Sequence, residues 1–368
     1  MNHGWEKKRL GEVCDIYQPK TISTKDLVEG GEYDVFGANG IIGKYTSYNH
    51  EEPEVLLTCR GATCGTINVS NPKSWINGNA MVVHPTSEGL SKSYLRIALQ
   101  AVDYTGVITG AAQPQITRIS LSPVVIPIPP LEKQKQIVLE LDKINEMLEV
   151  KRGQLKDLDM LSQSLFYEMF GDPIENPQGW ETFHLRDLVK EKLSYGSGAS
   201  GIPYDNKIRY IRITDIDERG NLKPEIASSP SEYNSKYMLK HGDILLARSG
   251  ATVGKAFLYK KSIGPAIYAG YLIKVSIDMS ILNSIYLYEF TKTAYYWNYI
   301  SKSIRGAAQP NVNAQLYGNL SIPVPPLSLQ NEFASKIEAI EGQKRVIEST
   351  ISDLEVLLAS RMDYWFND

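Results

Sequence analysis

Most of this chain consists of one sequence pattern that occurs twice, and this duplication constrains the fold more than any other feature. The segment that begins with GAAQP at 110–137 matches the segment at 306–333 without a gap, 196 residues later. Two further pairs recur at smaller offsets: LLTCRGATCG (56–65) with LLARSGATVG (245–254), and GWEKKRL (4–10) with GWETFHL (179–185). Self-similarity on this scale indicates two copies of one structural unit, of which the second carries insertions.

Each copy divides into two parts of different composition. The first part is rich in glycine and in β-branched and aromatic residues, as at 33–45 and 207–216, which is typical of short strands separated by turns. The second part follows a Pro-Pro pair at 129–130 or 325–326. Proline suits the first turn of a helix, where the N–H that it lacks would have no partner. We therefore expect a head of mixed short strands followed by a helix in each copy.

Beyond each Pro-Pro pair, apolar residues recur at alternating steps of four and three. This repeat favours a long helix that buries one seam against a second helix. A helix of about 40 residues would be roughly 60 Å long. Because that length exceeds the reach of one head, pairing the two helices is a better solution than packing each on its own head. The expected seam residues are Ile137, Leu141, Ile144, Leu148, Leu155 and Leu158 in the first copy and Ile337, Ile340, Ile347, Ile351, Leu354 and Leu358 in the second.

The order of these parts predicts the fold class and the domains. We expect an α+β protein in which two globular heads of mixed short strands are joined by two long antiparallel coiled-coil helices, as a pseudo-two-fold tandem repeat. The helices are expected to be antiparallel because only residues 171–178 separate the first helix from the second head. The expected segments are the first head at 1–128, the first helix at 129–172, the second head at 173–324 and the second helix at 325–368.

The composition argues against several other classes of protein. No run of about 18 apolar residues could span a membrane, and the first residues lack the apolar segment of a secretory signal, so we expect a cytoplasmic protein with no membrane partner. Cys14, Cys59 and Cys64 show no CxxC spacing and are expected to be reduced thiols. The five histidines lack metal-ligand spacing. A formal net charge of −3 neither favours nor excludes a polyanionic partner.

No catalytic motif stands out in either copy. The string GATVGK at 250–255 resembles part of a phosphate-binding loop, but it has one residue too few between its glycines, and Ala256 replaces the hydroxyl that would bind Mg²⁺. The first copy has Thr66 where the second has Lys255. We therefore expect a non-catalytic protein with no metal or cofactor of its own.

Two similar but diverged heads on a stiff spacer suit the recognition of a target in two unlike parts. On DNA, a pseudo-two-fold protein places its two readers on separated half-sites, and diverged heads would read an asymmetric pair. The alternative is an interaction scaffold whose heads bind proteins or glycans, which the near-neutral charge also allows. Binding to DNA would weaken steeply as the salt concentration rises, and this separates the two readings.

Several features together resemble the specificity (S) subunits of type I DNA restriction–modification enzymes. They are the repeated Trp-Glu starts, VFGANGIIG at 35–43, the Gly-Ala-Thr turns at 61–63 and 250–252, both GAAQP segments and the Pro-Pro-Leu starts of the helices. The resemblance covers essentially the whole chain. It implies a subunit without chemistry of its own that binds double-stranded DNA and two methyltransferase (M) subunits and works with restriction (R) subunits. S-adenosylmethionine, ATP and Mg²⁺ would then belong to those partner subunits.

Residues that would contact DNA are predicted from their types and from their places beside the recurring turns. Phosphates are bound by Lys, Arg, hydroxyl groups and backbone amides, and bases are read in the major groove by Arg, Lys, Asn and Gln. The candidates are Lys20, Asn39, Lys44, Tyr45 and Arg60 in the first head and Tyr204, Lys207, Arg209, Arg212, Arg248, Ser249 and Lys255 in the second.

Two pairs of candidates stand at corresponding places in the copies. Arg60 aligns with Ser249, so its position is one residue out of step with that of Arg248. Gln113 and Gln309 occupy the same place in the two GAAQP segments. These glutamines could contact a base or a phosphate, or their side chains could fix the turn that enters the last strand before each helix. A residue that two heads share cannot make their specificities differ, so we expect the second role, as structural joints.

Overall fold

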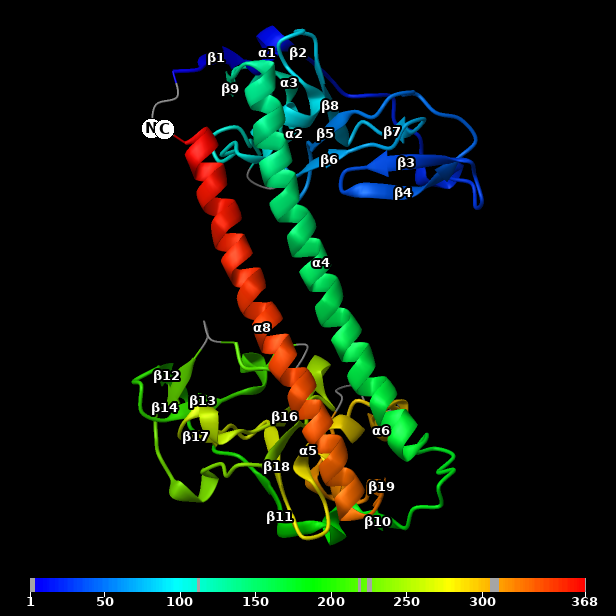
Figure 1. Ribbon diagram of the computed structural model, residues 1–368, viewed down its shortest axis with the longest axis vertical. Coiled ribbons are helices and arrows are strands. Elements are labelled where there is room, and N and C mark those ends of the chain that lie inside the picture. Colours follow the sequence, from blue (N-terminus) through cyan, green and yellow to red (C-terminus); the bar gives the residue numbers. More distant parts are fainter. Residues whose placement is uncertain (1–3, 111–112, 218–219, 224–226, 305–310, 368) are drawn as a thin grey trace. The chain divides into compact units, whose positions relative to one another are not determined.

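The computed structural model describes residues 4–110, 113–217, 220–223, 227–304 and 311–367. The chain divides into two compact units, of which unit 1 is Met1–Arg152 with Ser349–Asp368 and unit 2 is Gly153–Glu348. Both units include parts of the two long helices, α4 (Leu131–Phe170) and α8 (Leu327–Phe366) (Figure 1). Head 1 is the part of unit 1 that precedes α4, and head 2 is the part of unit 2 between α4 and α8.

Head 1 is built around a four-stranded antiparallel sheet in the order β2-β8-β5-β6. A second sheet has the order β4-β3-β7, with β3 and β7 parallel, and β1 pairs with β9. The strands are β1 (Glu6–Arg9), β2 (Cys14–Tyr17), β3 (Tyr33–Gly37), β4 (Gly40–Tyr45), β5 (Val55–Thr58), β6 (Ile67–Val69), β7 (Trp75–Ile76), β8 (Ala80–Pro85) and β9 (Val125–Ile128). The helices of head 1 are α1 (Leu10–Val13), α2 (Lys92–Gln100) and α3 (Arg118–Leu121).

Head 2 repeats this plan. Its four-stranded sheet has the order β11-β18-β15-β16, β13 and β17 are parallel, and β10 pairs with β19, while β12 pairs with β14. The strands are β10 (Thr182–His184), β11 (Val189–Tyr195), β12 (Gly201–Pro203), β13 (Arg209–Ile211), β14 (Ser228–Pro230), β15 (Ile244–Ala247), β16 (Ala256–Leu258), β17 (Ala266–Tyr268), β18 (Leu272–Ile277) and β19 (Ser321–Pro323). The helices of head 2 are α5 (Ser284–Phe290), α6 (Ala294–Ile304) and α7 (Ala314–Gly318). The shared strand order confirms the predicted tandem repeat of α+β heads.

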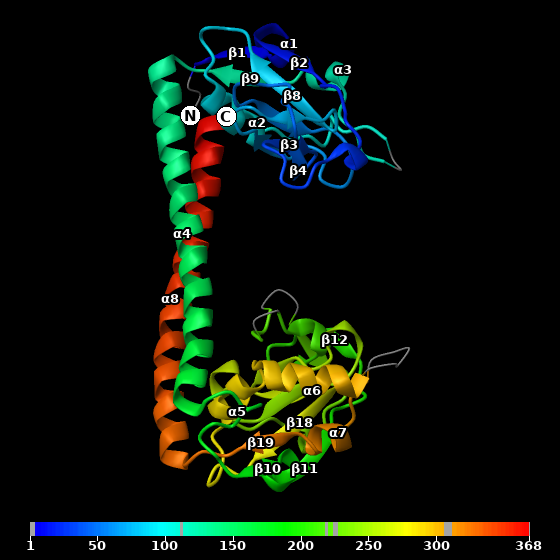
Figure 2. The same ribbon diagram turned by 90° about the vertical axis from the view of Figure 1, so that its right-hand side faces the viewer.

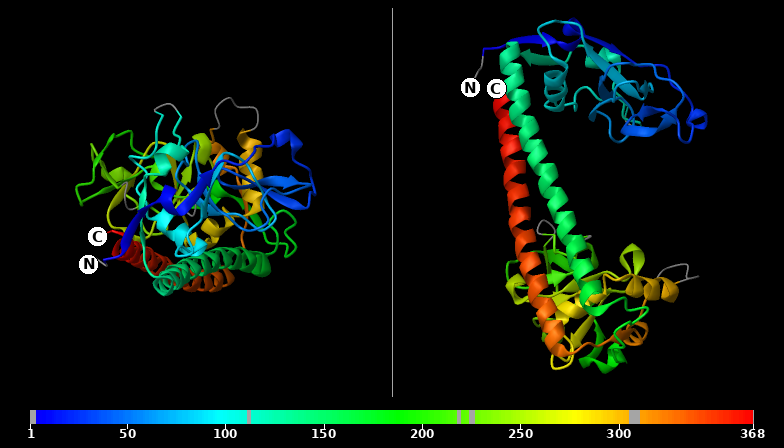
Figure 3. Two further views of the ribbon diagram at one scale, coloured as in Figure 1. Left: turned by 90° about the horizontal axis from the view of Figure 1, so that it is seen from above. Right: turned by 45° about the vertical axis from the view of Figure 1, so that its right-hand side comes forward.

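The long helices pair within each unit, and in each unit they run antiparallel (Figures 1 and 2). In unit 1, Arg152 of α4 meets Glu355 of α8 at 3.0 Å, whereas Glu140, earlier in α4, meets Arg361, later in α8. In unit 2, Asp159 of α4 lies 2.7 Å from Lys344 of α8, and the ring of Phe166, later in α4, lies 5.8 Å from that of Phe333, earlier in α8. The turned views in Figure 3 show the same pairing.

The predicted seam residues lie on the faces where the helices meet each other or a head. Eight of them are buried: Ile137, Leu141, Ile144, Leu148, Leu155, Ile337, Ile340 and Leu354. Four are half-buried: Leu158, Ile347, Ile351 and Leu358. The boundaries between the compact units fall inside the predicted helix segments at 129–172 and 325–368. Each unit contains part of both helices because the two helices pack against each other within it.

One seam position carries a charge in unit 2. Lys344 is buried, and its Nζ lies 2.7 Å from the carboxylate of Asp159 and 2.9 Å from that of Glu341. Burial alone would lower the pKa of Lys344, but its hydrogen bonds to the two carboxylates outweigh burial and raise that pKa. The corresponding residue of the first copy, 196 places earlier, is Leu148, which is buried among apolar residues.

Each head is joined to the start of its helix by a buried glutamine that the sequence reading did not single out. Gln134 and Gln330 are both 0% exposed. Gln134 accepts from the Ser91 backbone N–H at 3.0 Å and donates to the Gly89 and Pro129 carbonyls at 2.6 and 2.8 Å. Gln330 accepts from the Asn283 N–H at 2.8 Å and donates to the Pro325 carbonyl at 2.7 Å and the Ile281 carbonyl at 3.2 Å.

A buried tyrosine repeats the same joint. The hydroxyl of Tyr94 in α2 donates to the Pro127 carbonyl at 2.9 Å, and that of Tyr286 in α5 donates to the Pro323 carbonyl at 2.7 Å. Ser91 and Asn283 are the N-caps of these two helices, so each glutamine ties a cap in the head to the long helix.

None of the helices in the described part of the chain combines the length and the apolar character that a membrane crossing needs.

Candidate nucleic-acid interface

Three segments of head 1, two of which recur in the second copy, come together at one edge of its fold. The turn between β3 and β4 contains Asn39, whose Oδ1 accepts a hydrogen bond from Thr63 Oγ1 at 2.6 Å. Thr63 belongs to the Gly-Ala-Thr turn, where the N–H of Gly61 donates to the Pro114 carbonyl at 3.0 Å. Arg60, next to this turn, forms an isolated bridge with Gln115. The fold thus gathers the asparagine turn, the Gly-Ala-Thr turn and the end of the GAAQP segment, which are far apart in the sequence.

The turn at GAAQP in head 1 is closed by backbone groups. Thr109 and Gln115 exchange two backbone hydrogen bonds of 2.8 Å. Gly110 has φ +86°, and a Cβ at this position would lie 2.5 Å from the Gln113 carbonyl oxygen, so only glycine fits. The Gln113 side chain is exposed and forms no hydrogen bond to any residue that the structure describes. The hydrogen bonds described across this turn therefore come from backbone groups and from the Thr109 hydroxyl, which donates to the Gln115 carbonyl at 3.2 Å, and not, as we expected from the sequence, from the side chain of Gln113.

Head 2 shows the same arrangement with different residues. Ser249 forms an isolated bridge with Asn311, as Arg60 does with Gln115 in head 1. The N–H of Val312 donates to the Arg248 carbonyl at 2.8 Å, which holds the Gly-Ala-Thr turn of head 2 against the segment ahead of α7. The GAAQP segment at 306–310, with Gln309, lies outside the described residues.

The arginines beside the two Gly-Ala-Thr turns, Arg60 and Arg248, sit in different surroundings. Arg60 is exposed, while its neighbour Cys59 is 0% exposed. Arg248, at the position of Cys59, is half-buried, and its guanidinium carbon lies 4.6 Å from the centre of the Tyr195 ring. Ser249, at the position of Arg60, is half-buried. The heads therefore present an arginine at neighbouring positions of the same turn.

The other candidates of head 1 surround the small β4-β3-β7 sheet. Lys20 is exposed, Tyr45 is half-buried, and the Tyr45 ring meets the Trp75 ring edge to face with 5.4 Å between the ring centres. Lys44 pairs with Asp34 at 3.0 Å. Hydrogen bonds from Asn71 and from Lys44 lower the pKa of Asp34, so this carboxylate is ionised beside Lys44.

Two candidates of head 2 have partners inside the head. Arg212 pairs with Asp215 at 2.9 Å, and Asp215 is 0% exposed. The Nη2 of Arg209 donates to the Lys223 carbonyl at 2.8 Å. Because their contacts lie within the fold, Arg209 and Arg212 are less available to DNA than their spacing in the sequence suggests. Tyr204 and Lys207 are exposed, and Lys255 is half-buried.

Sequence reasoning missed Gln18, Tyr195 and Asn311, which lie beside the candidate turns. Gln18 follows β2 and Tyr195 is the last residue of β11, two strands whose sequences do not resemble each other, so no motif drew attention to them. The register of the strands was needed to find them.

The chain belongs to the family described as type I restriction modification DNA specificity domain, whose model matches residues 2–159 and 177–355. The two matches fall on the two copies of the repeat. The chain is 21% identical to the MjaVIII type I restriction enzyme specificity subunit of Methanocaldococcus jannaschii, with 92% of this chain and 86% of that one covered. It is 25% identical to a putative specificity subunit of Haemophilus influenzae, with 91% and 87% covered.

Solved structures agree on the fold. The S subunit of a type I restriction–modification system from M. genitalium superposes with a TM-score of 0.67 at 15% identity, covering 99% of this chain and 96% of that one. A structure from work on complex assembly and conformational transition of the type I system gives a TM-score of 0.57 at 17% identity, with 98% and 96% covered. The predicted fold class is confirmed.

Proposed function

We propose that this chain supplies the DNA sequence specificity of a type I restriction–modification complex by binding one asymmetric bipartite target, with one half-site for each head. The observation that carries the proposal is that the two heads share a strand order and a convergence of turns but place different polar side chains there. Arg, Asn and Gln at these turns are residue types that read base edges. A scaffold for proteins or glycans would not account for membership of a DNA-specificity family.

The chain acts without chemistry of its own in this proposal. Methylation and cleavage would be carried out by M and R subunits, which would hold S-adenosylmethionine, ATP and Mg²⁺. Support comes from the family and from the specificity subunits that the chain resembles. We propose two M subunits, one for each copy of the repeat.

Apolar side chains that point outward from the long helices are the proposed docking surface for the M subunits. In unit 1, Met147 is 40% exposed, Val356 is 68% exposed and Leu357 is 45% exposed. Val138 is half-buried against head 1 and is a weaker candidate. Exposed apolar side chains on a helix favour a protein partner over water.

The proposal is tested by footprinting the full chain, assembled with its M partner, on DNA. We expect protection of one sequence made of two unlike half-sites separated by a gap of fixed length, and affinity that falls steeply as salt rises. Protection of no preferred sequence would remove the proposal. Affinity without salt dependence would favour the protein or glycan scaffold.

The helices are proposed to set the gap between half-sites. Adding one heptad to both α4 and α8 lengthens each by about 10 Å, which corresponds to about 3 base pairs of DNA. We expect the gap in the footprint to change while both half-site sequences stay the same. An unchanged gap would contradict this role of the helices.

A further inference from the structure

The strand register identifies residues of the two heads that occupy the same place. In head 1, Leu56 of β5 lies opposite Val82 of β8, and Val82 lies opposite Tyr17 at the end of β2. The next residue, Gln18, leaves the sheet beside Cys59, which follows β5. The Nε2 of Gln18 donates to the Cys59 Sγ at 3.1 Å and to the Gly78 carbonyl at 2.9 Å, so this place is filled by internal contacts.

The same path in head 2 leads to an aromatic residue and an arginine. Leu245 of β15, the repeat counterpart of Leu56, lies opposite Lys274 of β18, and Lys274 lies opposite Ser194 of β11. The next residue is Tyr195, and the residue after β15 is Arg248. Tyr195 therefore stands where Gln18 stands in head 1, and Arg248 stands where Cys59 stands.

Arg248 is held in place by contacts on several sides. Its guanidinium lies over the Tyr195 ring, and the Tyr195 hydroxyl accepts from the Ala314 N–H at 3.1 Å. The backbone N–H of Arg248 donates to the Tyr271 carbonyl at 3.1 Å. A guanidinium placed over an aromatic ring can still donate hydrogen bonds to other partners.

The donors of this guanidinium are largely unused within the described part of the chain. Nη2 makes one long contact of 3.5 Å with Asn311 Oδ1, and the buried Nε has no hydrogen-bond partner among the described residues. Beside it, the Tyr195 and Tyr271 side chains are 41% and 65% exposed, and Asn311 is exposed. A charged group with unused donors, held at an exposed aromatic edge, is suited to an external acceptor.

We propose that Arg248, positioned by Tyr195, reads a guanine in the half-site of head 2 by donating to its O6 and N7. This inference rests on the proposed function. A planar guanidinium in a fixed position matches the two acceptors of guanine in the major groove. A phosphate contact carries no sequence information and gives no reason for the two heads to differ at this place. The corresponding place in head 1 has no cation, so the two half-sites differ there.

The test is selection of binding sites from a random DNA library by the full chain with its M partner. The wild-type chain is compared with Arg248→Lys, which keeps the positive charge but loses the paired N–H donors of the guanidinium, and with Arg248→Ala. We expect both variants to lose the preference for guanine at one position of one half-site by about tenfold or more. The other half-site and the gap should be unchanged.

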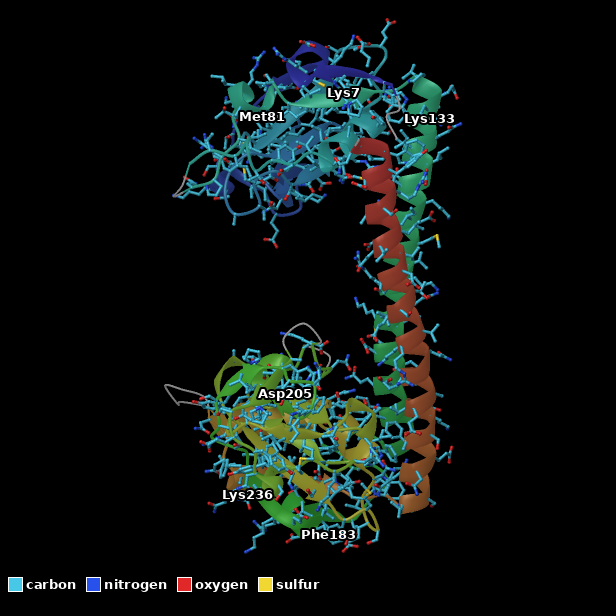
Figure 4. All side chains as sticks on the ribbon, turned by 90° about the vertical axis from the view of Figure 1, so that its left-hand side faces the viewer. Lys7, Met81, Lys133, Phe183, Asp205 and Lys236 are labelled. Carbon is cyan, nitrogen blue, oxygen red and sulfur yellow. The ribbon has the colours of Figure 1, made fainter. Side chains whose placement is uncertain are left out.

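Tyr195 is tested as a positioning residue. Tyr195→Leu should relax the same guanine position as Arg248→Lys, and Tyr195→Phe, which keeps the ring, should retain the preference. The matched control is Lys236→Ala. Lys236, which Figure 4 labels elsewhere in head 2, lies 4.6 Å from the centre of the Tyr237 ring, and its loss should not alter the selected bases. Thermal melting shows whether each variant is folded, and Arg248→Lys carries the test if Arg248→Ala is not.

Two results would overturn the inference. Equal weakening on all sequences would show that Arg248 binds a phosphate, and an unchanged preference in folded variants would show that it reads no base. A wild-type chain that selects no sequence would instead refute the proposed function, so the two failures are distinguishable.

Discussion

The two joints between a helix and a head are built on the same hydrogen bonds but packed with different side chains. Gln134 and Tyr94 in unit 1 make the same kinds of bonds as Gln330 and Tyr286 in unit 2. In unit 2 the space beside these bonds is filled by aromatic rings. Phe170 lies 4.8 Å from Tyr286 and 5.0 Å from Phe333, measured between ring centres.

The same space in unit 1 contains charges and tryptophans. Trp365 stacks on Trp5 at 5.9 Å and donates from Nε1 to the Glu140 carboxylate at 3.1 Å. Arg361 pairs with Glu140, and Lys133, which Figure 4 labels near the start of α4, lies 5.3 Å from the centre of the Trp365 ring. The two copies of the repeat therefore share the backbone-directed bonds that join a helix to its head, whereas the side chains beside those bonds have diverged.

Removing an aromatic ring from the core of unit 2 should cause the greatest loss of stability. Phe166 is 1% exposed and lies 5.5 Å from the Tyr286 ring, so Phe166→Ala should lower the free energy of unfolding of unit 2 by about 3–5 kcal/mol. Its counterpart in unit 1, Met362, is half-buried, and Met362→Ala should cost less. Chemical denaturation measures the loss of unfolding free energy in both variants, and hydrogen exchange shows in which unit each loss occurs. Equal losses would contradict the claimed difference between the joints.

Replacing the buried glutamine at either joint should cause the second-largest loss of stability, of equal size in the two units. Gln134→Leu and Gln330→Leu each leave one buried N–H and two carbonyls without their partner, so each should lower the free energy of unfolding by about 2–4 kcal/mol. Gln113→Leu is the control, because that side chain is exposed, and it should have little effect. Denaturation curves of the three variants test this, and a loss in only one unit would show that the joint is not a shared device.

The smallest effect should be confined to unit 1 and should depend on pH. The hydrogen bond from Arg361 holds the pKa of Glu140 below its ordinary value of 4.5. Ionised Glu140 therefore stabilises the fold above that value, and the contribution is lost as pH falls through the lower folded-state pKa. Because the pair is partly exposed, Glu140→Gln should cost at most about 1 kcal/mol at neutral pH, and the difference from the wild type should vanish in acid.

The control for this prediction is the residue 196 places later, Lys336. It pairs with Glu332 at 2.9 Å, and both side chains are about half exposed. Lys336→Gln should leave the stability of unit 2 nearly unchanged between pH 3 and 7. Thermal melts of both variants across this range decide the matter, and equal pH profiles would refute the assignment.

The repeat and the two long helices could be predicted from the sequence, whereas the pairing of individual side chains could not. The Pro-Pro pairs and the heptad spacing predicted helices that the structure places at Leu131–Phe170 and Leu327–Phe366. Gln134 and Gln330 lie in the matched segments but look like ordinary surface residues of a helix, because their partners come from distant turns. The Arg212–Asp215 pair could have been foreseen from its spacing of three, which is typical of a capped turn. Tyr195 could not, because only strand register places it beside Arg248.

We propose above that two heads of one design read two unlike half-sites of a single DNA target. Single-molecule sequencing of methylated bases in host DNA, with and without this chain, tests it most directly. We expect one asymmetric sequence, interrupted by a gap of fixed length, to lose its methylation when the chain is absent. Unchanged methylation, or the loss of a symmetric or uninterrupted site, would contradict it.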